Sequence, residues 1–536
     1  CQGSYGGDEQ MRVLVSDSLS EKGLALLRAE EGMEVVVNTK LSPEELIAEI
    51  PKYDALIVRS ATKVTADVIE AATSLKVIGR AGVGVDNIDL DAATKRGIIV
   101  VNTPGGNSAS TAEHTIAMLL AMARNIPQAH MSMKQGKWDR KRFIGVEVRG
   151  KVLGVIGLGR VGMEVVKAAV GLGMEVIGYD PFISADVTRP LKVKLADLDD
   201  LCRQSDFITV HTPLNEQTRG LIDARRLGLV KPGVRIVNCA RGGIIDEAAL
   251  IEALKSGTVA AAALDVYENE PPTSSELLAL DNVVLTPHLG ASTEEAQDNV
   301  AIDAARQVIN VLKGQSFRNA VNLPSIDPET YDHLKPYLSL ASRLGAFLGA
   351  TCRGSLEAVE IEYTGELADL DVSPVTNYLL QGFLSSVTED HVTIVNAPLI
   401  ARSRGIRVSE TKSKNHKGVP PAIRTRAVGK EKSRSISGTV YAGSEMRIIE
   451  VDGYRMDFAP HGDMLLIPHI DQPGVIGAVG QLLGREKINI AAMHVGRREI
   501  GGQAVMLLGI DGLPSRQSLD AIKTVDGVLD VYYVRL

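Results

Sequence analysis

Residues 151–180 read KVLGVIGLGRVGMEVVKAAVGLGMEVIGYD, and the organisation of the whole chain can be worked out from this stretch. It opens with an apolar, β-branched run at 152–156, a pattern typical of a buried strand. The loop GLGRVG follows at 157–162, then a helical pattern, then a second apolar run that ends at Asp180. A strand, a glycine turn, a helix, a strand and an acid in this order are typical of a unit that binds a dinucleotide.

Each glycine of the loop has a separate predicted role. Gly157 permits the tight turn, Gly159 lets the backbone approach a pyrophosphate at the positive helix N-terminus, and Gly162 lets the helix pack closely on the strand. Asp180 can accept hydrogen bonds from the ribose diol of an adenosine and would repel a 2′-phosphate, which favours NAD over NADP. An ordinary tight turn between a strand and a helix is the alternative interpretation.

The composition narrows the class of protein. A length of 536 residues suggests about three or four domains, and a hydrophobic content of 45% is ample for buried cores. The net charge of −8 gives no indication of nucleic-acid binding. The four cysteines lie far apart without metal-ligand spacing, which predicts no metal site and a reduced, cytoplasmic protein. These cysteines are Cys1, Cys202, Cys239 and Cys352.

Targeting segments are not expected. No apolar run reaches the ~18 residues that a membrane span needs. Residues 1–10, CQGSYGGDEQ, are polar and glycine-rich and lack the apolar core of a secretory signal. We expect them to form a disordered leader, with the fold beginning at Met11.

The first part of the chain, 11–105, alternates strand and helix patterns and predicts an α/β unit with a mostly parallel sheet. Unusual loops follow its strands: Arg59-Ser60, RAGVGVDN at 80–87 and NTPGGNS at 102–108. Ligands bind outside the carboxyl ends of strands in such sheets. Two arginines and a glycine-rich loop at these ends indicate an anionic ligand, with solvated loop arginines as the alternative.

A second α/β unit is predicted at 151–290, again with a polar loop after each strand. The two units also resemble each other in sequence. Residues 97–102 read GIIVVN and residues 233–238 read GVRIVN, and each is followed by a loop that ends in Gly-Gly. This short repeat suggests two similar lobes that face a shared cleft.

Two segments are strongly basic. KQGKWDRKR at 134–142 contains the only Trp, and it suits a solvated face, an anionic substrate or a subunit contact. Residues 401–435 contain eleven Lys and Arg but only two Glu. This segment is interpreted either as an exposed loop or as a site for a small anionic effector. The lack of aromatic residues there argues against nucleic acid. Elsewhere in the less regular part 325–455, we expect a helix over 375–387 and a strand over 392–397.

The C-terminal part, 463–536, predicts strand, helix, strand, strand, helix and strand. This βαββαβ order is typical of a ferredoxin-like fold. It contains no catalytic constellation, so regulation or assembly is its expected use.

Three residues at strand ends of the second unit suit the oxidation of a 2-hydroxy acid. His288 can accept the hydroxyl proton near neutral pH. Glu270 can bond the far ring nitrogen, fix the tautomer and raise its basicity. Arg241 can bind a substrate carboxylate through two hydrogen bonds. Loop caps or surface ion pairs are the alternative roles.

The chain resembles the D-isomer-specific 2-hydroxy acid dehydrogenases, and most of all their long forms with extra C-terminal domains. The motifs are spread over nearly the whole chain, which makes the resemblance specific. They are GRAGVGVDNID at 79–89, NTPGGNSASTAEHT at 102–115, GLGRVG, NCARGGIIDE at 238–247, ALDVYENEPP at 263–272, TPHLGAST at 286–293 and NAPLIARSRGI at 396–406.

The resemblance implies an α/β fold of two Rossmann- and flavodoxin-like lobes with parallel sheets, an α+β intervening domain and a ferredoxin-like ACT domain. The substrate-binding domain would be discontinuous, at 11–108 and 292–318, around an NAD-binding domain at 109–291. The intervening domain would occupy 319–460 and the ACT domain 463–536.

The resemblance also implies site residues, with His288 as acid/base, Glu270 as its partner and Arg241 as the substrate-orienting residue. Implied NAD contacts are Val83, Gly157, Gly159, Arg160, Val161, Gly162, Asp180, His211, Thr212, Cys239, Ala240, Arg241, Asp265, His288, Gly290 and Ala291. Implied substrate contacts are Arg59, Ser60, Arg80, Gly82, Val83, Gly84, Asn107 and Arg140. An effector, expected to be L-serine, would bind at His469, Asp471 and Asn489.

The expected reaction is the NAD-dependent oxidation of 3-phospho-D-glycerate to 3-phosphohydroxypyruvate, the first step of phosphorylated L-serine synthesis, in a homotetramer. Another D-2-hydroxy acid is one alternative substrate, and Arg59, Arg80 and the extra domains argue against it. A nicotinamide-sensing protein like the corepressors built on this fold is an alternative of another class. The ACT-like tail argues against that second alternative.

Overall fold

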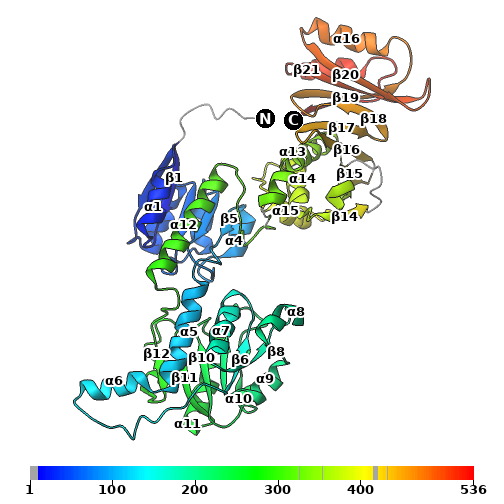
Figure 1. The fold of residues 1–536 in the computed structure, drawn as a ribbon. Coiled ribbons are helices and arrows are strands. Elements are labelled where there is room, and N and C mark those ends of the chain that lie inside the picture. Colours follow the sequence, from blue (N-terminus) through cyan, green and yellow to red (C-terminus); the bar gives the residue numbers. More distant parts are fainter. Residues whose placement is uncertain (1–9, 325, 327, 353, 414–420, 431) are drawn as a thin grey trace.

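The computed structural model describes residues 10–324, 326, 328–352, 354–413, 421–430 and 432–536. Four sheets organise these residues into successive units (Figure 1). The expected leader at 1–10 lies outside the described residues, apart from Gln10. Within the described ranges, none of the helices has the length and apolar character that crossing a membrane requires. In the same ranges, no three His, Cys, Asp or Glu side chains are grouped to hold a metal ion.

The first unit, named the substrate lobe after its predicted role, is a five-stranded parallel sheet of order β2-β1-β3-β4-β5. β3 is buried at every position, as expected in a parallel sheet with both faces covered. α12 returns to this unit from far along the chain and packs on α1, β3 and β4. The elements are β1 Met11–Val15, α1 Glu21–Arg28, β2 Met33–Val37, α2 Pro43–Glu49, η1 Ile50–Lys52, β3 Ala55–Val58, α3 Ala66–Ala71, β4 Val77–Arg80, α4 Leu90–Arg96, β5 Ile99–Val101 and α12 Glu294–Leu312.

The second unit, the NAD lobe, is a seven-stranded parallel sheet of order β12-β11-β10-β9-β6-β7-β8. The strand order reverses between β6 and β9, and ligands bind in the crevice at such a switch point. The elements are α5 Ser108–Ala123, α6 Ile126–Lys134, β6 Val152–Ile156, α7 Arg160–Gly171, β7 Glu175–Tyr179, α8 Ala185–Thr188, η2 Arg189–Leu191, β8 Lys194–Leu195, α9 Leu198–Gln204, β9 Phe207–Val210, α10 Ala224–Leu227, β10 Val234–Asn238, α11 Glu247–Ser256, β11 Val259–Leu264, η3 Glu276–Ala279 and β12 Val283–Leu285.

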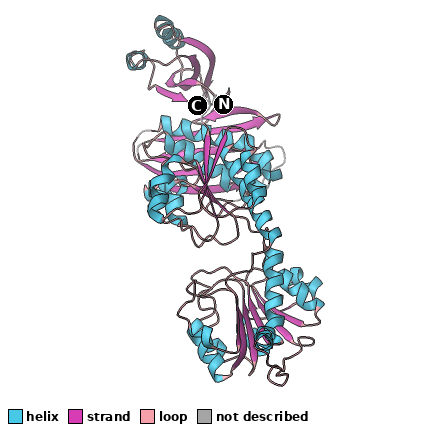
Figure 2. Cartoon of the chain, turned by 90° about the vertical axis from the view of Figure 1, so that its left-hand side faces the viewer, coloured by secondary structure: helices cyan, strands magenta, loops and turns pink. Residues whose placement is uncertain are grey.

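The chain passes between the two lobes twice. α5 begins beside the substrate lobe and runs along the NAD lobe, and the start of α12 makes the return crossing (Figures 1 and 2). Ser110 of α5 and Thr293, the N-cap of α12, lie together at this crossing, with their hydroxyl oxygens 2.8 Å apart. α6 projects from the edge of the NAD lobe (Figure 1).

The third unit combines a six-stranded sheet of order β14-β13-β15-β16-β17-β18 with the helix pair α13 and α14. The helix expected at 375–387 is confirmed by α14. The basic segment 401–435 is not a simple loop, because its described residues include strands β14 and β15 and the start of β16. The elements are α13 Pro328–Thr351, β13 Leu356–Thr364, η4 Gly365–Asp369, α14 Ser373–Ser385, α15 Ala397–Ser403, β14 Arg407–Ser413, β15 Ala422–Gly429, β16 Ser433–Tyr441, β17 Glu445–Val451 and β18 Tyr454–Phe458.

The prediction of a strand at 392–397 is wrong, because this segment forms a turn that leads into α15. Thr393 N donates to Asn396 Oδ1 (2.7 Å), so the side chain of Asn396 fixes the turn in place of a sheet partner. The turn also docks on the substrate lobe. Thr393 Oγ1 donates to the carbonyl of Gly97 (3.1 Å), and Asn396 Nδ2 donates to the carbonyl of Lys95 (3.3 Å).

The fourth unit confirms the expected βαββαβ order. Its antiparallel sheet has the order β20-β21-β19-β22. The elements are β19 Asp463–Ile470, α16 Val475–Arg485, β20 Asn489–Arg497, β21 Gln503–Asp511, α17 Arg516–Lys523 and β22 Tyr532–Arg535.

Candidate active site

The glycine loop between β6 and α7 has the geometry expected for a pyrophosphate cradle. Gly157 has a φ of +92°, and a Cβ there would lie 2.5 Å from the carbonyl oxygen of His211. A Cβ on Gly162 would lie 2.0 Å from the carbonyl oxygen of Gly157, so only glycine permits this close packing. Gly159 caps α7, and a Cβ on it would meet nothing within 4 Å. Its backbone therefore faces open space at a helix N-terminus, where an anion is stabilised.

Polar groups around this loop fit a dinucleotide. Within the described part of the chain, His211 Nδ1 and Thr212 Oγ1 are buried without a hydrogen-bond partner. Burial lowers the pKa of His211 to about 4, so this imidazole is neutral. Asp180 is fixed beside the loop, because its carboxylate accepts the N–H groups of Leu158 and Phe182, both at 2.9 Å. These residues match the groups that would hold NAD.

His288 and Glu270 form an acid–base pair on the loops after β11 and β12. His288 Nδ1 lies 2.8 Å from Glu270 Oε2, and Glu270 Oε1 accepts the N–H of Tyr267 (3.2 Å). Burial acts to raise the pKa of Glu270, but the hydrogen bond and charge of His288 and the Tyr267 N–H outweigh it, so this pKa lies below its ordinary value. We assign the ring hydrogen of His288 to Nδ1 from this hydrogen bond. This assignment leaves Nε2 to exchange a proton with a ligand.

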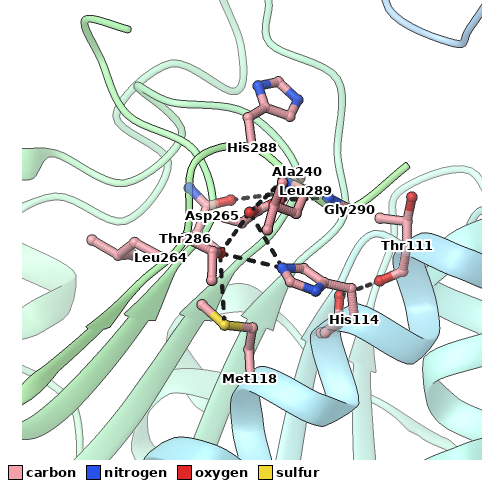
Figure 3. Close-up of polar contacts among 12 residues, drawn as sticks. Thr111, His114, Met118, Ala240, Leu264, Asp265, Thr286, His288, Leu289 and Gly290 are labelled. Carbon is pink, nitrogen blue, oxygen red and sulfur yellow. Dashed lines mark hydrogen bonds and ion pairs between the residues drawn. The ribbon is translucent and has the colours of Figure 1, made fainter. Parts of the chain in front are cut away.

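The buried carboxylate of Asp265 anchors the loop that carries His288 (Figure 3). It accepts the hydroxyl of Thr286 (2.6 Å) and the N–H groups of Leu289 (2.7 Å) and Gly290 (2.8 Å). The main-chain carbonyl of Asp265 also accepts the N–H of His288 (2.9 Å). The Asp265 carboxylate therefore holds the loop on which His288 sits.

Arg241 reaches from the NAD lobe to the substrate lobe. Its Nε donates to Asp86 Oδ2 (2.9 Å), and its Nη1 donates to the carbonyl of Ala240 (2.6 Å). Asn238 holds the Arg241 loop, because its Nδ2 donates to the Arg241 carbonyl (2.9 Å). A Cβ on Gly84 would lie 1.7 Å from Arg241 Nη2, so the guanidinium lies directly against the glycine loop of the other lobe.

Cations gather on the substrate lobe at the same place. Burial, followed by the charges of Arg241 and Arg59, lowers the pKa of Arg80 to about 10. Arg80 Nε and Asn107 Oδ1 are buried without a partner among the described residues. A Cβ on Gly82 would lie 1.4 Å from Arg80 Nη1, so this glycine makes room for the guanidinium. Three guanidinium groups and the unpartnered N–H of Arg80 Nε fit a small anion, whereas Asn107 Oδ1 can accept a hydrogen bond from a ligand hydroxyl.

Most other predicted contacts lie at the same strand ends. Arg160 and Val161 form the first turn of α7, Val83 is 36% exposed on the glycine loop, and Ser60 is exposed after β3. Burial raises the pKa of the Cys239 thiol to about 12, so this thiol stays protonated at neutral pH. Ala240, Gly290 and Ala291 lie on the loops of Arg241 and His288.

Arg140 is an exception, because the structure does not bring it to this cleft. Its neighbour Arg142 forms an ion pair with Asp281 (3.6 Å), before the N-terminal end of β12. His288 follows the opposite end of the same strand. Within one chain, Arg140 therefore lies away from the other predicted substrate contacts.

Comparison with known proteins identifies the family. Residues 116–290 match the NAD-binding domain of the D-isomer specific 2-hydroxyacid dehydrogenases, 333–452 match the D-3-phosphoglycerate dehydrogenase intervening domain, and 465–527 match the ACT domain. A D-3-phosphoglycerate dehydrogenase of Archaeoglobus fulgidus is 49% identical over 98% of this chain and over its own whole length. The chain belongs to the D-3-phosphoglycerate dehydrogenase family. This confirms the sequence resemblance and NAD as the cofactor.

Other members and neighbours agree. The D-3-phosphoglycerate dehydrogenase of Bacillus subtilis is 44% identical over 98% of this chain and 99% of its own length. A Thermus thermophilus crystal structure is 36% identical and covers 58% of this chain and all of its own, with a TM-score of 0.54. An Aquifex aeolicus D-lactate dehydrogenase, solved with NAD and lactic acid, is 28% identical and covers 56% of this chain and 96% of its own, with a TM-score of 0.51.

The effector residues predicted from the family's ACT domain do not meet within one chain. His469 lies opposite Ala504 of β21, whereas Asn489 lies opposite Asp511. Seven residues along β21 correspond to a separation of about 23 Å. His469 is also only 1% exposed. Asp471 follows β19 near His469, so Asn489 is the residue that stands apart.

Sequence reasoning missed residues that support the predicted catalytic groups. His114, Thr286, Asn238 and Asp86 all contact the loops or side chains of the predicted trio. His114 lies within the NTPGGNSASTAEHT motif at 102–115, but the resemblance implied no role for it. The signal was the clustering of polar residues directly after apolar strands, as in VN at 237–238 and LTPH at 285–288.

Proposed function

We propose that this chain oxidises 3-phospho-D-glycerate to 3-phosphohydroxypyruvate with NAD, the first step of phosphorylated L-serine synthesis. The observation that carries the proposal is the contact of Arg241 with Asp86 across the two lobes, beside Arg80 and Arg59. The proposal is supported by the closeness of the three guanidinium groups, since Arg241 could bind a carboxylate while two further cations remain beside it. A molecule with a carboxylate at one end and a phosphate at the other fits such an arrangement, and the names of the relatives support it.

The chain's own residues supply binding and proton transfer. Arg241 would bind the substrate carboxylate and orient the C2 hydroxyl, while Arg59 and Arg80 bind the phosphate. His288 Nε2 would accept the hydroxyl proton, and Glu270 would stabilise the resulting imidazolium through Nδ1. Bound NAD supplies the acceptor for the C2 hydride. Apposition of the lobes would exclude water from this space.

We propose the domain boundaries given by the resemblance, and a homotetramer with L-serine as effector. A serine site built from His469, Asp471 and Asn489 needs residues of two chains, because Asn489 stands apart from the other two in one chain. Assembly is supported by large apolar side chains on α6 and the loop after it. Their exposed fractions are 53% for Ile126, 57% for Met131, 52% for Met133, 76% for Trp138 and 80% for Ile144.

Arg140 lies on the loop after α6, between Trp138 and Ile144, so it would contribute to a substrate site only across such an interface. The three described cysteines are unpaired, which supports action in the reducing cytoplasm.

The test is NADH formation at alkaline pH from 3-phospho-D-glycerate, D-glycerate and D-lactate, each with and without millimolar L-serine. We expect turnover of the phosphorylated acid alone, and suppression by serine. Arg59→Gln is expected to raise the KM for phosphoglycerate at least tenfold, whereas Arg96→Gln, an exposed arginine on α4, leaves it unchanged. Preferred turnover of glycerate or lactate would refute the phosphate assignment. Tight NADH binding without turnover of any acid would favour a sensor.

A further inference from the structure

The Asp265 carboxylate is 0% exposed and has four hydrogen-bond donors around it. Three of them, Thr286 Oγ1 and the N–H groups of Leu289 and Gly290, belong to the loop that it holds. A buried carboxylate left with an unmet acceptor position is costly, since desolvation is not repaid. The position of this loop therefore depends on every donor being present.

The fourth donor comes from a different element. His114 of α5 places Nε2 3.2 Å from Asp265 Oδ1 and 3.3 Å from Thr286 Oγ1 (Figure 3). The hydroxyl proton of Thr286 is directed to Asp265 at 2.6 Å, so the hydrogen on His114 Nε2 serves the remaining acceptor positions. His114 is the residue by which α5 hydrogen-bonds the Asp265 carboxylate, and Met118 of the same helix contacts Thr286 through its sulfur (3.7 Å).

α5 is also the first crossing between the two lobes. It begins directly after Asn107 of the predicted substrate site, and Ser110 meets Thr293 of the return crossing (2.8 Å). The helix that carries His114 thus runs from the substrate loop to the His288 loop. A displacement of this helix would therefore be transmitted through His114 to the loop that carries His288.

We infer that His114 is a positioning residue for His288, acting through Asp265, and that it couples the lobe crossing to the acid–base pair. It touches neither of the reacting centres. Its Nε2–H fixes the Asp265 carboxylate, the carboxylate fixes the 286–290 loop, and the loop fixes His288 opposite Glu270. The inference rests on the proposed function for its assay, and the unmodified chain tests that function separately.

The decisive pair of variants is His114→Gln and His114→Asn. The Gln amide nitrogen can occupy the position of Nε2 and donate to Asp265, whereas the shorter Asn amide falls at the position of Nδ1 and cannot reach. His391→Phe, at an exposed histidine of the third unit, is the matched control. Each protein is assayed for kcat, for the KM of NAD, and for the primary isotope effect with 2-deuterated 3-phospho-D-glycerate. Thermal melts establish that each variant is folded.

We expect His114→Asn to lower kcat at least tenfold and to raise the isotope effect on kcat, because hydride and proton transfer become slower. His114→Gln should keep both kcat and the KM for NAD within threefold of the values of the unmodified chain. Equal losses in both variants, or more than half of the activity in the Asn variant, would overturn the inference. If the Asn variant does not fold, His114→Met replaces it, since Met fills a similar volume without a donor.

Discussion

His288 Nδ1 lies 2.8 Å from Glu270 Oε2, although eighteen residues separate the two in sequence. Neither residue is deeply buried, with 44% of the His288 side chain and 39% of the Glu270 side chain exposed. The pair is held by its surroundings instead. Tyr267 N–H bonds the carboxylate of Glu270, and Asp265 holds the His288 loop. The loop of Glu270 thus holds the loop of His288, because Asp265 and Tyr267 lie on the former and bond the latter, Tyr267 through its hydroxyl to the carbonyl of Thr286 (2.9 Å).

Replacing Glu270 by Gln should lower kcat by about tenfold to hundredfold, because the neutral amide does not stabilise an imidazolium. The steady-state rate with 3-phospho-D-glycerate measures this effect. Glu252→Gln is the control, since Glu252 is 76% exposed on α11. A Gln variant with full kcat would refute the role assigned to Glu270.

The same substitution predicts a pH dependence of stability. The pKa of Glu270 lies below its ordinary value of 4.5, so its contribution to folding is present above that value and is lost as the pH falls through the lowered pKa. The unmodified chain should therefore melt at a higher temperature than Glu270→Gln at pH 6, and the difference should shrink between pH 4.5 and pH 3. Thermal melts across this range check the sign, and a constant difference would contradict it.

Alanine substitutions at two glycines of the 157–162 loop should affect different properties, one the stability of the protein and the other its affinity for NADH. Gly162→Ala forces a Cβ to 2.0 Å from the Gly157 carbonyl oxygen, and overpacking of this kind costs about 1–3 kcal/mol. Its melting temperature should fall. Gly159→Ala meets nothing within 4 Å, so its melting temperature should hold while its affinity for NADH falls at least tenfold. A thermal melt and an NADH fluorescence titration of both variants separate the two effects.

Asp180→Asn should relax the choice of cofactor. The carboxylate repels a 2′-phosphate, and the amide does not. We expect the ratio of kcat/KM for NADP to that for NAD to rise at least tenfold. Asp186→Asn, at a 79% exposed acid on α8, should leave the ratio unchanged. An unchanged ratio in Asp180→Asn would mean that the cofactor is selected elsewhere.

The docking of the third unit on the substrate lobe can be tested with two helix C-caps. Gly97 and Gly257 both end a helix in the left-handed region, with φ of +81° and +79°. Alanine costs about 1–2 kcal/mol at either position. Only at Gly97 would its Cβ also meet Thr393 Oγ1, at 2.5 Å. Gly97→Ala should therefore lower the melting temperature more than Gly257→Ala, and equal losses would show that this docking adds no stability.

The sequence alone determined the local features of this protein. The glycine loop at 157–162 and the βαββαβ order at 463–536 were predicted correctly, because they rest on backbone freedom and on short-range apolar patterns. His288, Glu270 and Arg241 were predicted as catalytic residues because each follows an apolar strand, and the structure brings His288 and Glu270 together. The turn at 392–397 was misjudged as a strand, since the hydrogen bonds of Asn396 outweigh its β-branched residues.

Only the tertiary structure decided which distant residues meet. His114 lies 151 residues before Asp265, and Thr393 lies 296 residues after Gly97, so no local pattern could pair them. The same holds for the separation of Asn489 from His469, which depends on strand register across β21. Local propensity depends on residues that are close in sequence. A buried charge or carbonyl instead needs a hydrogen-bond partner that is close in space, and only the folded chain brings that partner to it.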